Sequence, residues 1–441
     1  MSIKNHVYKN GFRVVYQKST GCSNIASIQV FCDVGSIHEP DESRGSAHFI
    51  EHMCFKGTKK LKNARDVNII FDKTGSDSNA FTDRRYTCYY VNTDKDNVKL
   101  CVSTLADMVL NSVFDKNEYL KEREVVREEA VKDEDDYELL AFTNADKQIY
   151  AGSPYANTVD ELQYHIGNHI LKYENILEIY KKYYVPSNMI LSICCSLPFE
   201  DICKFVEQSD FTKAINREPR PALNLCITPQ TDVIYNIIKK STNPTHLCIG
   251  FRSCSLYDVD KYPMKLLKNI LSGRITSRMF MILREDNGLT YTSYAYSDFF
   301  EHMGDFKLYA ECDTAKFLKN GSKPGVFPLL TKMINDLLQH GITEEELKIA
   351  KGFMKGFQKM KGEDSSIIAK YNGKNQLFGI TNTPSYVDKY EKLIEPITKE
   401  QIYLCVKKYF KREGMVVSII SSNPPSEKQI CKFVDKIDFS Q

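Results

Sequence analysis

The sequence predicts an α+β protein in which two homologous α/β layered domains, each an antiparallel-rich sheet with helices, follow one another in tandem. Strand-like and helix-like segments alternate in the first half, a polar stretch punctuated by prolines lies near the middle, and the order strand, acidic loop, helix then begins again. At 441 residues the chain also exceeds the usual size of one hydrophobic core, so at least two domains are expected.

The first half alternates between strands and helices. Runs rich in Val, Ile and Phe predict strands over residues 12–17 and 25–34, the second closed by Gly35. The other elements expected here are helices over 46–55 and 63–73, a strand over 87–92, helices over 97–111, 116–140 and 171–184, and a strand over 189–197. This alternation indicates a sheet covered by helices.

The stretch SDFTKAINREPRPALNLCITP divides the two halves. It predicts a first domain over 1–210, a linker over 211–229 and a second domain over 230–441. After it, HLCIGFRSCSLYDVDKYPMKLLKNIL has the same order of elements as IASIQVFCDVGSIHEPDESRGSAHFIEHM, with Phe31 and Phe251 in matching places. This internal repeat predicts two copies of one α/β unit.

Composition and charge exclude several classes of protein. The formal net charge is only +2, which gives no electrostatic reason to expect a nucleic acid or membrane partner. No run approaches the roughly 18 apolar residues of a membrane span, and the N-terminus lacks the features of a secretory signal or organelle presequence. The 14 cysteines are scattered without a Cys-x-x-Cys pair, which favours free thiols in a reducing compartment. We therefore expect a cytoplasmic protein.

The run HFIEH contains the residue types of a metal site. His48 and His52 lie four residues apart, so on a helix both imidazoles can reach one ion, and Glu51 lies on the same face. Two neutral imidazoles with a carboxylate beside an open position are what a hydrolytic zinc site requires. The order H-x-x-E-H is the inverted form of a common zinc motif. The apolar positions expected to anchor this helix in the core are Ala47, Ile50 and Cys54.

Two alternatives compete with this interpretation. A chance pair of surface histidines is one, since the pattern arises by chance in about one chain in a hundred. His165 and His169 are such a pair, with the helix weakened by Gly167 between them. A closed structural zinc site is the other, but it usually has four Cys or His ligands. Cys54 lies about 200° around the helix from His52 and is poorly placed to complete one.

A hydrolytic zinc site requires a third protein ligand. The acidic run LKEREVVREEAVKDEDDYE offers several glutamates, most of which belong to a solvated helix face. At about 100° per residue, one face contains Glu122, Val125, Val126 and Glu129. The valines predict that this face is buried, so both of its glutamates are candidates, and periodicity does not choose between them.

The sequence resembles the pitrilysin-type inverted-zincin metallopeptidases, especially the two-domain branch that contains processing peptidases. GSIHEP…RGSAHFIEHMCFKGT matches that family's signature closely, and KEREVVREEA resembles its second motif, whose last glutamate is the third zinc ligand. The resemblance implies one zinc ion per chain, held by His48, His52 and Glu129. It gives Glu122 a supporting role behind these ligands.

Two further stretches resemble the family. GSDSNAFTDRRYTCYY resembles the segment in which an edge strand pairs with the substrate backbone, which implies that role for Asn79 and Ala80; Ser76 departs from the family's more usual glycine. ILSGRITSRMFMILREDNGLTYTSYAY resembles a stretch of the second domain, and implies that Arg284 and Tyr291 complete the active site. The second domain has lost the metal ligands themselves, because KLLKN stands where the first has HFIEH.

Together these features predict a zinc metalloendopeptidase of the processing-peptidase type, in which Glu51 acts as the general base that activates water. The alternative is a non-catalytic core or assembly subunit, since the family includes such proteins. Retention of the six expected metal-binding and catalytic residues weighs against it. The resemblance also implies a peptide substrate and a homodimer or heterodimer.

Overall fold

The computed structural model describes residues 3–19, 23–159, 171–215, 226–381 and 383–440, which form two compact units. The first unit comprises Met1–Lys132, Asn157–Asn224 and Gln358–Asp388. The second comprises Asp133–Ala156, Leu225–Phe357 and Lys389–Gln441. Each unit therefore contains one segment from the opposite half of the chain, which the expected boundaries at 210 and 230 do not capture. The expected linker, 211–229, lies partly outside the described residues.

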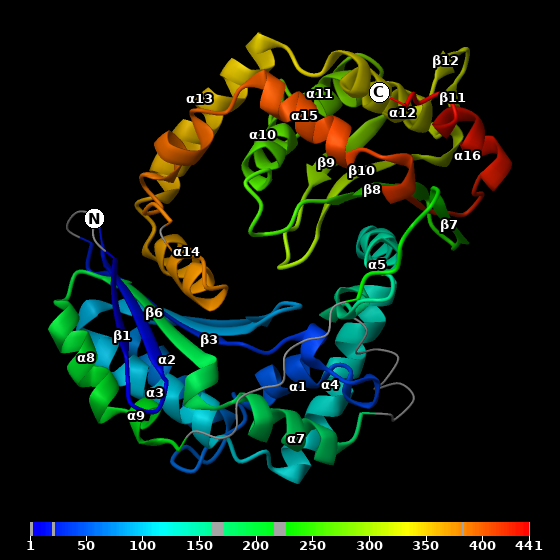
Figure 1. The fold of residues 1–441 in the computed structure, drawn as a ribbon. Helices are drawn as coiled ribbons and strands as arrows, with labels where there is room; N and C mark the ends of the chain where they lie inside the picture. The colour runs from blue at the N-terminus through cyan, green and yellow to red at the C-terminus, as the bar shows by residue number, and fades with distance from the viewer. Residues whose placement is uncertain (1–2, 20–22, 160–170, 216–225, 382, 441) are drawn as a thin grey trace. The chain divides into compact units, whose positions relative to one another are not determined.

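The first unit is built on a six-stranded sheet of order β1-β2-β6-β3-β5-β4. Only β2 and β6 pair in parallel; the other neighbours are antiparallel. The strands are β1 (Ile3–Val7), β2 (Arg13–Lys18), β3 (Ile25–Cys32), β4 (Asp77–Thr82), β5 (Thr87–Asp94) and β6 (Met189–Cys195). The helices are α1 (Ser46–Met53), α2 (Ala64–Thr74), α3 (Val98–Asn111), α4 (Lys116–Glu134), α7 (Tyr173–Tyr183), α8 (Phe199–Gln208), α9 (Asp210–Lys213) and α14 (Ser365–Leu377) (Figure 1).

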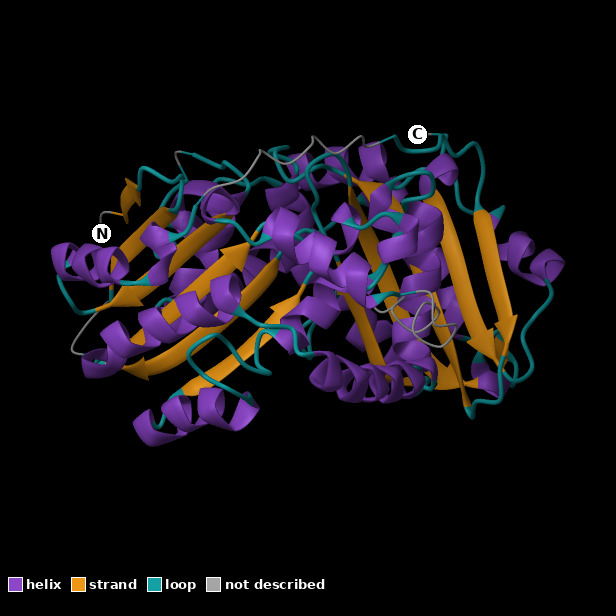
Figure 2. Ribbon diagram, turned by 90° about the horizontal axis from the view of Figure 1, so that it is seen from below, coloured by secondary structure: helices purple, strands orange, loops and turns teal. Residues whose placement is uncertain are grey.

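The second unit has a five-stranded sheet of order β7-β13-β8-β10-β9. Its strands are β7 (Ile234–Lys239), β8 (Pro244–Ser253), β9 (Thr290–Tyr296), β10 (Gly304–Asp313) and β13 (Met415–Ser421). A separate short hairpin pairs β11 (Lys319–Asn320) with β12 (Lys323–Pro324). The helices are α5 (Tyr137–Ile149), α10 (Lys261–Leu271), α11 (Arg278–Phe280), α12 (Val326–His340), α13 (Glu344–Lys361), α15 (Lys399–Tyr409) and α16 (Glu427–Val434). Purple helices lie against the orange strands of each sheet in Figure 2.

The two sheets share one topology. Each sheet contains one parallel pair of strands, β2 with β6 in the first and β7 with β13 in the second. In both sheets this pair is followed by three antiparallel pairs. Phe31 of β3 and Phe251 of β8 lie at corresponding strands and are both fully buried. The predicted fold class, two α/β layered domains related by an internal repeat, is therefore confirmed.

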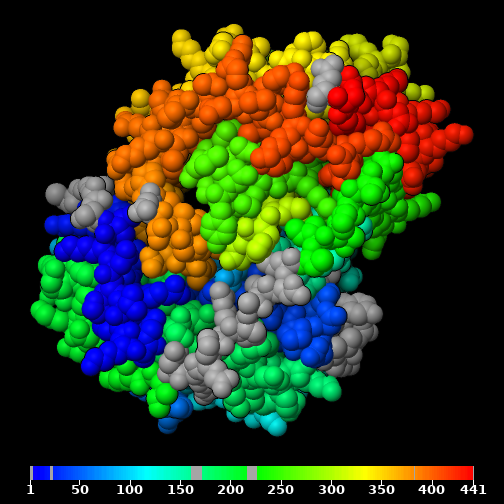
Figure 3. Space-filling view, viewed as in Figure 1, coloured from blue at the N-terminus to red at the C-terminus, as the bar shows by residue number. Residues whose placement is uncertain are grey.

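Helices α5 and α14 are exchanged between the halves. α5 comes from the first half but packs on β8 and β13, whereas α14 comes from the second half and packs on β3 and β6. They are equivalent elements: each follows an aspartate N-cap, and Ala141 and Asn144 of α5 recur as Ala369 and Asn372 of α14. Figure 3 shows the orange surface of the 358–388 segment beside the blue surface of the N-terminal strands.

Two glycines, which have no side chain, allow the exchanged helices to pack closely against their sheets. A Cβ on Gly373 of α14 would lie 2.2 Å from the ring of Phe31 in β3. A Cβ on Gly250 of β8 would lie 2.6 Å from the Cδ1 atom of Ile149 in α5. Each helix therefore packs against its sheet at a point where one partner has no side chain.

The helix expected over 116–140 is in fact two helices, because Asp136 caps the second. Its side chain accepts a hydrogen bond at 3.0 Å from the backbone N–H of Leu139, the geometry of an N-cap. The pattern of acidic and apolar residues continues through this region without interruption, so it does not indicate where the first helix ends and the second begins. Its position matters, since α4 belongs mainly to the first unit and α5 to the second.

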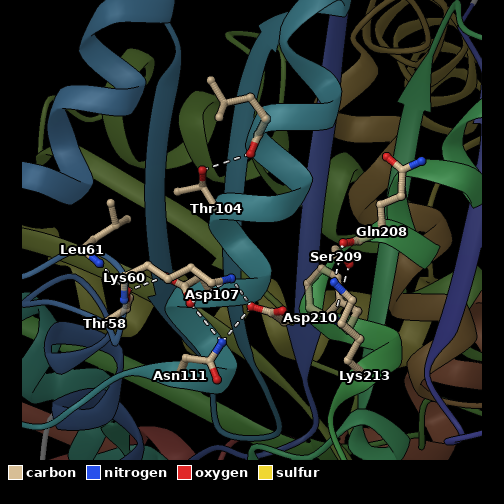
Figure 4. Close-up of polar contacts among 12 residues, drawn as sticks. Thr58, Lys60, Leu61, Thr104, Asp107, Asn111, Gln208, Ser209, Asp210 and Lys213 are labelled. Atoms are coloured by element: carbon tan, nitrogen blue, oxygen red, sulfur yellow. Dashed lines mark hydrogen bonds and ion pairs between the residues drawn. The ribbon is translucent and has the colours of Figure 1, made fainter.

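A polar network fixes the loop that comes after α1. The buried carboxylate of Asp107 in α3 accepts hydrogen bonds from Thr58 of this loop and from Asn111, and Asp210 accepts from Lys60 at 2.5 Å (Figure 4). The hydroxyl of Ser112 donates to the carbonyl of Met53, the last residue of α1, at 3.2 Å. These contacts hold the C-terminal end of α1 against α3.

Candidate metal centre

Helix α1 is fixed at its start by a buried glutamate. Glu39 accepts hydrogen bonds from the N–H groups of Gly45 (2.7 Å) and Ala47 (2.6 Å), and its negative charge suits the N-terminal end of the helix. Gly45 adopts a left-handed conformation, with φ of 89°, that favours glycine. Ala47, Ile50 and Cys54 are all fully buried, so the predicted anchoring stripe is confirmed.

His48, His52 and Glu129 offer ligand atoms that all lie within 4.8 Å of one another. The Nε2 atoms of the two histidines are 3.1 Å apart, and His52 Nε2 lies 3.6 Å from a carboxylate oxygen of Glu129. Zinc bonds of about 2.0–2.1 Å in a tetrahedron require ligand atoms about 3.3 Å apart. Two imidazoles and one carboxylate at this spacing therefore fit zinc and leave a fourth position for water.

Glu122 holds His52 from behind. The ring nitrogen Nδ1 of His52 lies 2.8 Å from Glu122 Oε1, and Lys56 Nζ lies 2.5 Å from Glu122 Oε2. Burial opposes ionisation of Glu122, but the hydrogen bonds from His52 and Lys56 prevail and lower its pKa. An ionised carboxylate only accepts, so Nδ1 carries the proton and Nε2 faces the metal position.

The two histidines have opposite electrostatic surroundings. Burial, together with the smaller effect of the His52 charge, lowers the pKa of His48 to about 4. Burial alone would also lower the pKa of His52, but the carboxylates of Glu122, Glu129 and Glu51 outweigh it and raise that pKa. His48 is therefore neutral near pH 7, as a metal-binding imidazole has to be, and His52 is oriented by carboxylates on both sides.

Glu51 is buried beside the histidines. Its Oε2 atom accepts a hydrogen bond of 2.6 Å from the hydroxyl of Thr82, the last residue of β4. Burial raises the pKa of Glu51, and the bond from Thr82 opposes that rise. A carboxylate with a raised pKa beside a candidate metal site is suited to take up and release a proton.

The prediction that the shared face of Glu122, Val125, Val126 and Glu129 is buried is wrong for two of these four residues. Glu122 and Val126 are buried, but Val125 is 44% exposed and the side chain of Glu129 is 47% exposed. The core ends near the middle of α4, so its second half extends past the apolar residues that bury the first half. Helical periodicity gives the direction of a side chain but not where along a helix the packing stops.

Asn79 and Ala80 lie on β4, which is the edge strand of the first sheet. The N–H of Ala80 is bonded to the side-chain oxygen of Asn79 at 2.8 Å rather than to β5. This N–H therefore faces the open edge of the sheet. Thr82, on the same strand, contacts Glu51, so the edge strand ends at the metal centre.

Arg284 and Tyr291 belong to the second unit and lie against each other. Arg284 lies in a short π-helical turn, and its guanidinium lies 4.7 Å from the centre of the Tyr291 ring and 5.1 Å from that of Phe280. Tyr291, on β9, is 84% exposed. The pair presents a cation and a phenol side by side on one surface of that unit.

The structure also bears on the alternatives. His165 and His169 lie outside the described residues. Among the described residues, His48, His52 and Glu129 form the one group of His, Cys, Asp or Glu side chains that could hold a metal ion. Cys54, which is buried, is not part of it. In the second unit, α10 comes after β8 as α1 comes after β3, but carries lysine, leucine and asparagine in place of ligands.

Sequence reasoning missed Thr82 and Lys56, which hold Glu51 and Glu122. Both lie close to recognisable motifs, Thr82 at the end of the predicted edge-strand segment and Lys56 four residues after His52. Their pairing with particular carboxylates depends on tertiary packing, and no spacing in the sequence indicates it.

Comparison with known proteins identifies matching family models and related sequences. Residues 13–161 match the family described as insulinase, peptidase family M16, and residues 171–353 match the peptidase M16 inactive domain. An uncharacterized zinc protease of Bacillus subtilis is 31% identical over 85% of this chain and 88% of its own. One from Mycobacterium tuberculosis is 27% identical over 86% and 84%, respectively.

Solved structures show the same fold. A protease from Helicobacter pylori has a TM-score of 0.85 at 20% identity, over 95% of this chain and 99% of its own. The first half of the periplasmic protease PqqL from Escherichia coli has a TM-score of 0.78 at 16% identity, over 99% and 96%. No helix in the described part of the chain is long and apolar enough to cross a membrane.

Proposed function

Because this chain belongs to peptidase family M16, we propose that it is a zinc metalloendopeptidase that hydrolyses extended peptides. The observation that carries the proposal is the convergence of His48, His52 and Glu129 with the buried carboxylate of Glu51 beside them. His48, His52 and Glu129 would hold one zinc ion. Bound there, zinc would supply Lewis-acid chemistry and lower the pKa of water.

Glu51 is the proposed general base. Its raised pKa favours accepting a proton from the attacking water and later giving that proton to the leaving amine. The hydrogen bond from Thr82 leaves one carboxylate oxygen of Glu51 available for this transfer and fixes the orientation of the group.

The substrate is proposed to bind as an additional strand along β4. An extended peptide could accept a hydrogen bond from the outward N–H of Ala80 after displacing the Asn79 side chain. Backbone pairing of this kind tolerates many side chains. Arg284 and Tyr291 are proposed to donate hydrogen bonds to the substrate carbonyl as it gains negative charge.

The test compares Glu51→Gln and His52→Ala with the unmodified protein for zinc content and cleavage of a quenched-fluorescence peptide. Glu51→Gln is expected to retain zinc but to lose at least about 100-fold in kcat, since proton transfer contributes typically about 10²–10⁴-fold. His52→Ala is expected to lose both. Full activity in either variant would contradict the assignment.

A non-catalytic assembly subunit is the alternative function, and chelator-sensitive peptide cleavage by the purified protein separates the two. All 13 described cysteines are free thiols, which supports the proposal that the protein works in a reducing compartment such as the cytoplasm. We also propose a homodimer or heterodimer as the working form, which light scattering of the purified protein would test.

A further inference from the structure

Helix α14 places two lysines beside the edge strand of the first sheet. This helix belongs to the first unit and packs on β3 and β6. Lys370 and Lys374 lie four residues apart, so both extend from one side of the helix. The ammonium of Lys370 lies 4.3 Å from the centre of the Phe81 ring on β4. That of Lys374 lies 5.2 Å from the centre of the Tyr86 ring, directly before β5.

The edge strand β4 presents different side chains to its two faces. Ala80 packs against the hydrophobic cluster that includes residues of α1 and α3, and Thr82 donates a hydrogen bond to Glu51. Phe81 lies between them, so its side chain points to the other face, where it meets Lys370. In a peptide paired with β4, alternate side chains would therefore face the lysines of α14.

The positive charges of Lys370 and Lys374 are not neutralised by a bound carboxylate. In the part of the chain that the structure describes, neither ammonium forms an ion pair, and each lies over an aromatic ring instead. The surrounding protein atoms, and then the charge of Lys374, lower the pKa of Lys370, against opposing effects of Cys88 and Asp83. A carboxylate bound beside the two lysines would reduce the repulsion between them.

We propose that Lys370 and Lys374 bind a carboxylate of the peptide substrate, located within about two residues of the cleaved bond. Directly opposite residues on adjacent strands point to the same face, about 4.5–5.5 Å apart at Cβ, so the residue opposite Phe81 extends toward Lys370. The next residue of β4, Thr82, contacts Glu51, which brings this position close to the proposed general base. The inference rests on the proposed function, because it assumes that the peptide pairs with β4.

The experiment uses blocked, otherwise neutral quenched-fluorescence peptides of about ten residues, long enough to extend along β4. Positions on both sides of the cleaved bond carry Glu, Gln or Lys in turn. Two further peptides with neutral side chains end near that bond in a free carboxylate or an amide, which distinguishes a side chain from a C-terminus as the source of the charge. At one position, kcat/KM is expected to be about fivefold higher for the carboxylate than for its neutral counterpart, and lowest for Lys.

Substitution of the lysines tests whether they cause this preference. Lys370→Met retains an unbranched side chain over Phe81 without the charge, and should lower the ratio of kcat/KM for Glu over Gln about fivefold. Lys374→Met should lower it less, because that ammonium lies over Tyr86 rather than over β4. Lys370→Glu should favour the Lys peptide instead. Since each ratio compares two peptides on one preparation, partial unfolding of a variant cancels from it.

Lys99→Met is the matched control. It removes the same charge from an exposed position on α3, which lies on the other side of the sheet from α14 (Figure 1). Exposed charges more than about 10 Å apart are largely screened at 0.1 M salt, so the ratio should stay within about twofold of that of the unmodified protein.

Binding to Glu51→Gln, measured by fluorescence anisotropy with labelled forms of the same peptides, separates this inference from the peptidase assignment. If no peptide is cleaved, but the carboxylate peptide binds more tightly and Lys370→Met in that background removes the preference, the carboxylate site stands and the peptidase assignment falls. If peptides are cleaved or bound without preference for a carboxylate, or the preference survives in both lysine variants, the inference is overturned.

Discussion

His52 has a carboxylate beside each nitrogen of its ring. Glu122 lies at Nδ1 and Glu129 near Nε2, and Lys56 balances the charge of Glu122. His48 has no carboxylate ion pair of this kind among the described residues; it makes a polar contact with Nε2 of His52, at 3.1 Å. The two histidines therefore contribute differently, since the direction of the His52 lone pair depends on a residue 70 positions away in the chain.

Glu122→Gln tests this dependence. An amide retains the size of the side chain but fixes the His52 ring less firmly and supports its basicity less, so we expect zinc affinity to fall about 10–100-fold. Chelator competition measures the change. Glu124→Gln, at an exposed position on the same helix, is the control and should change affinity by less than about twofold.

A pH effect is expected at Lys389, where burial lowers the pKa of the ammonium to about 8 from an ordinary value of 10.5. A depressed pKa means that the unfolded chain binds the proton more strongly, so this group adds stability above pH 10.5 and loses it as pH falls through 8. Lys389→Met should therefore raise the free energy of unfolding at pH 7, by up to roughly 3 kcal/mol.

Urea unfolding between about pH 7 and 10.5 tests this expectation. The advantage of Lys389→Met should shrink as pH rises, whereas Lys392→Met, at an exposed position nearby, should show no such trend. A difference between Lys389→Met and the unmodified protein that stays constant with pH would show that lost contacts, rather than the charge, cause the effect.

At the scale of elements, the sequence predicts α1, and the gathering of its two histidines, well because the motif is local. His48, Glu51 and His52 lie within two turns of one helix, where spacing determines direction. The end of α4 was less predictable, since Asp136 resembles the acidic residues around it and only its capping bond distinguishes it. The contact of Thr82 with Glu51 could not be predicted, because it depends on how β4 pairs.

The packing of α14 gives a prediction at this scale. Gly373→Ala would place a methyl group against the Phe31 ring, and we expect a loss of about 1–3 kcal/mol in the free energy of unfolding. Combining it with Phe31→Leu should recover part of that loss. Denaturant unfolding measures both.

Gly352→Ala in α13 is the matched control. Apart from its chain neighbours and the backbone of its own helix, no atom lies within 4 Å of the added Cβ. Alanine is also the better helix former, so we expect a gain of about 0.5–1 kcal/mol. Equal effects at Gly352 and Gly373 would contradict the close contact with Phe31.

At the scale of the whole molecule, the internal repeat could be predicted but the exchange of helices could not. The buried faces of α5 and α14 combine small, polar and apolar residues, and neither sequence pattern indicates which sheet the helix covers. The choice depends on groups distant in sequence, such as Lys307 opposite Asp146 and Phe31 opposite Gly373.

The exchange predicts that neither half of the chain folds alone. A fragment of residues 1–210 lacks α14 over its own sheet, and exposes the face of α5 that packs on the second sheet. We expect this fragment and 230–441 each to bind the dye ANS and to aggregate, and to form a soluble 1:1 complex when expressed together. A monomeric 1–210 fragment with a cooperative thermal transition would refute this.

The reciprocal exchange also bears on the origin of the chain. A half-length ancestor that folded in this way would have had a sheet lacking its cover and a helix lacking its sheet. In a dimer of two such copies, the helix of each copy would have covered the sheet of the other. Fusion of the two genes would then keep both exchanged helices within one polypeptide. One copy could afterwards lose its metal-ligand residues, although its sheet would still be needed to pack against the helix of the other copy.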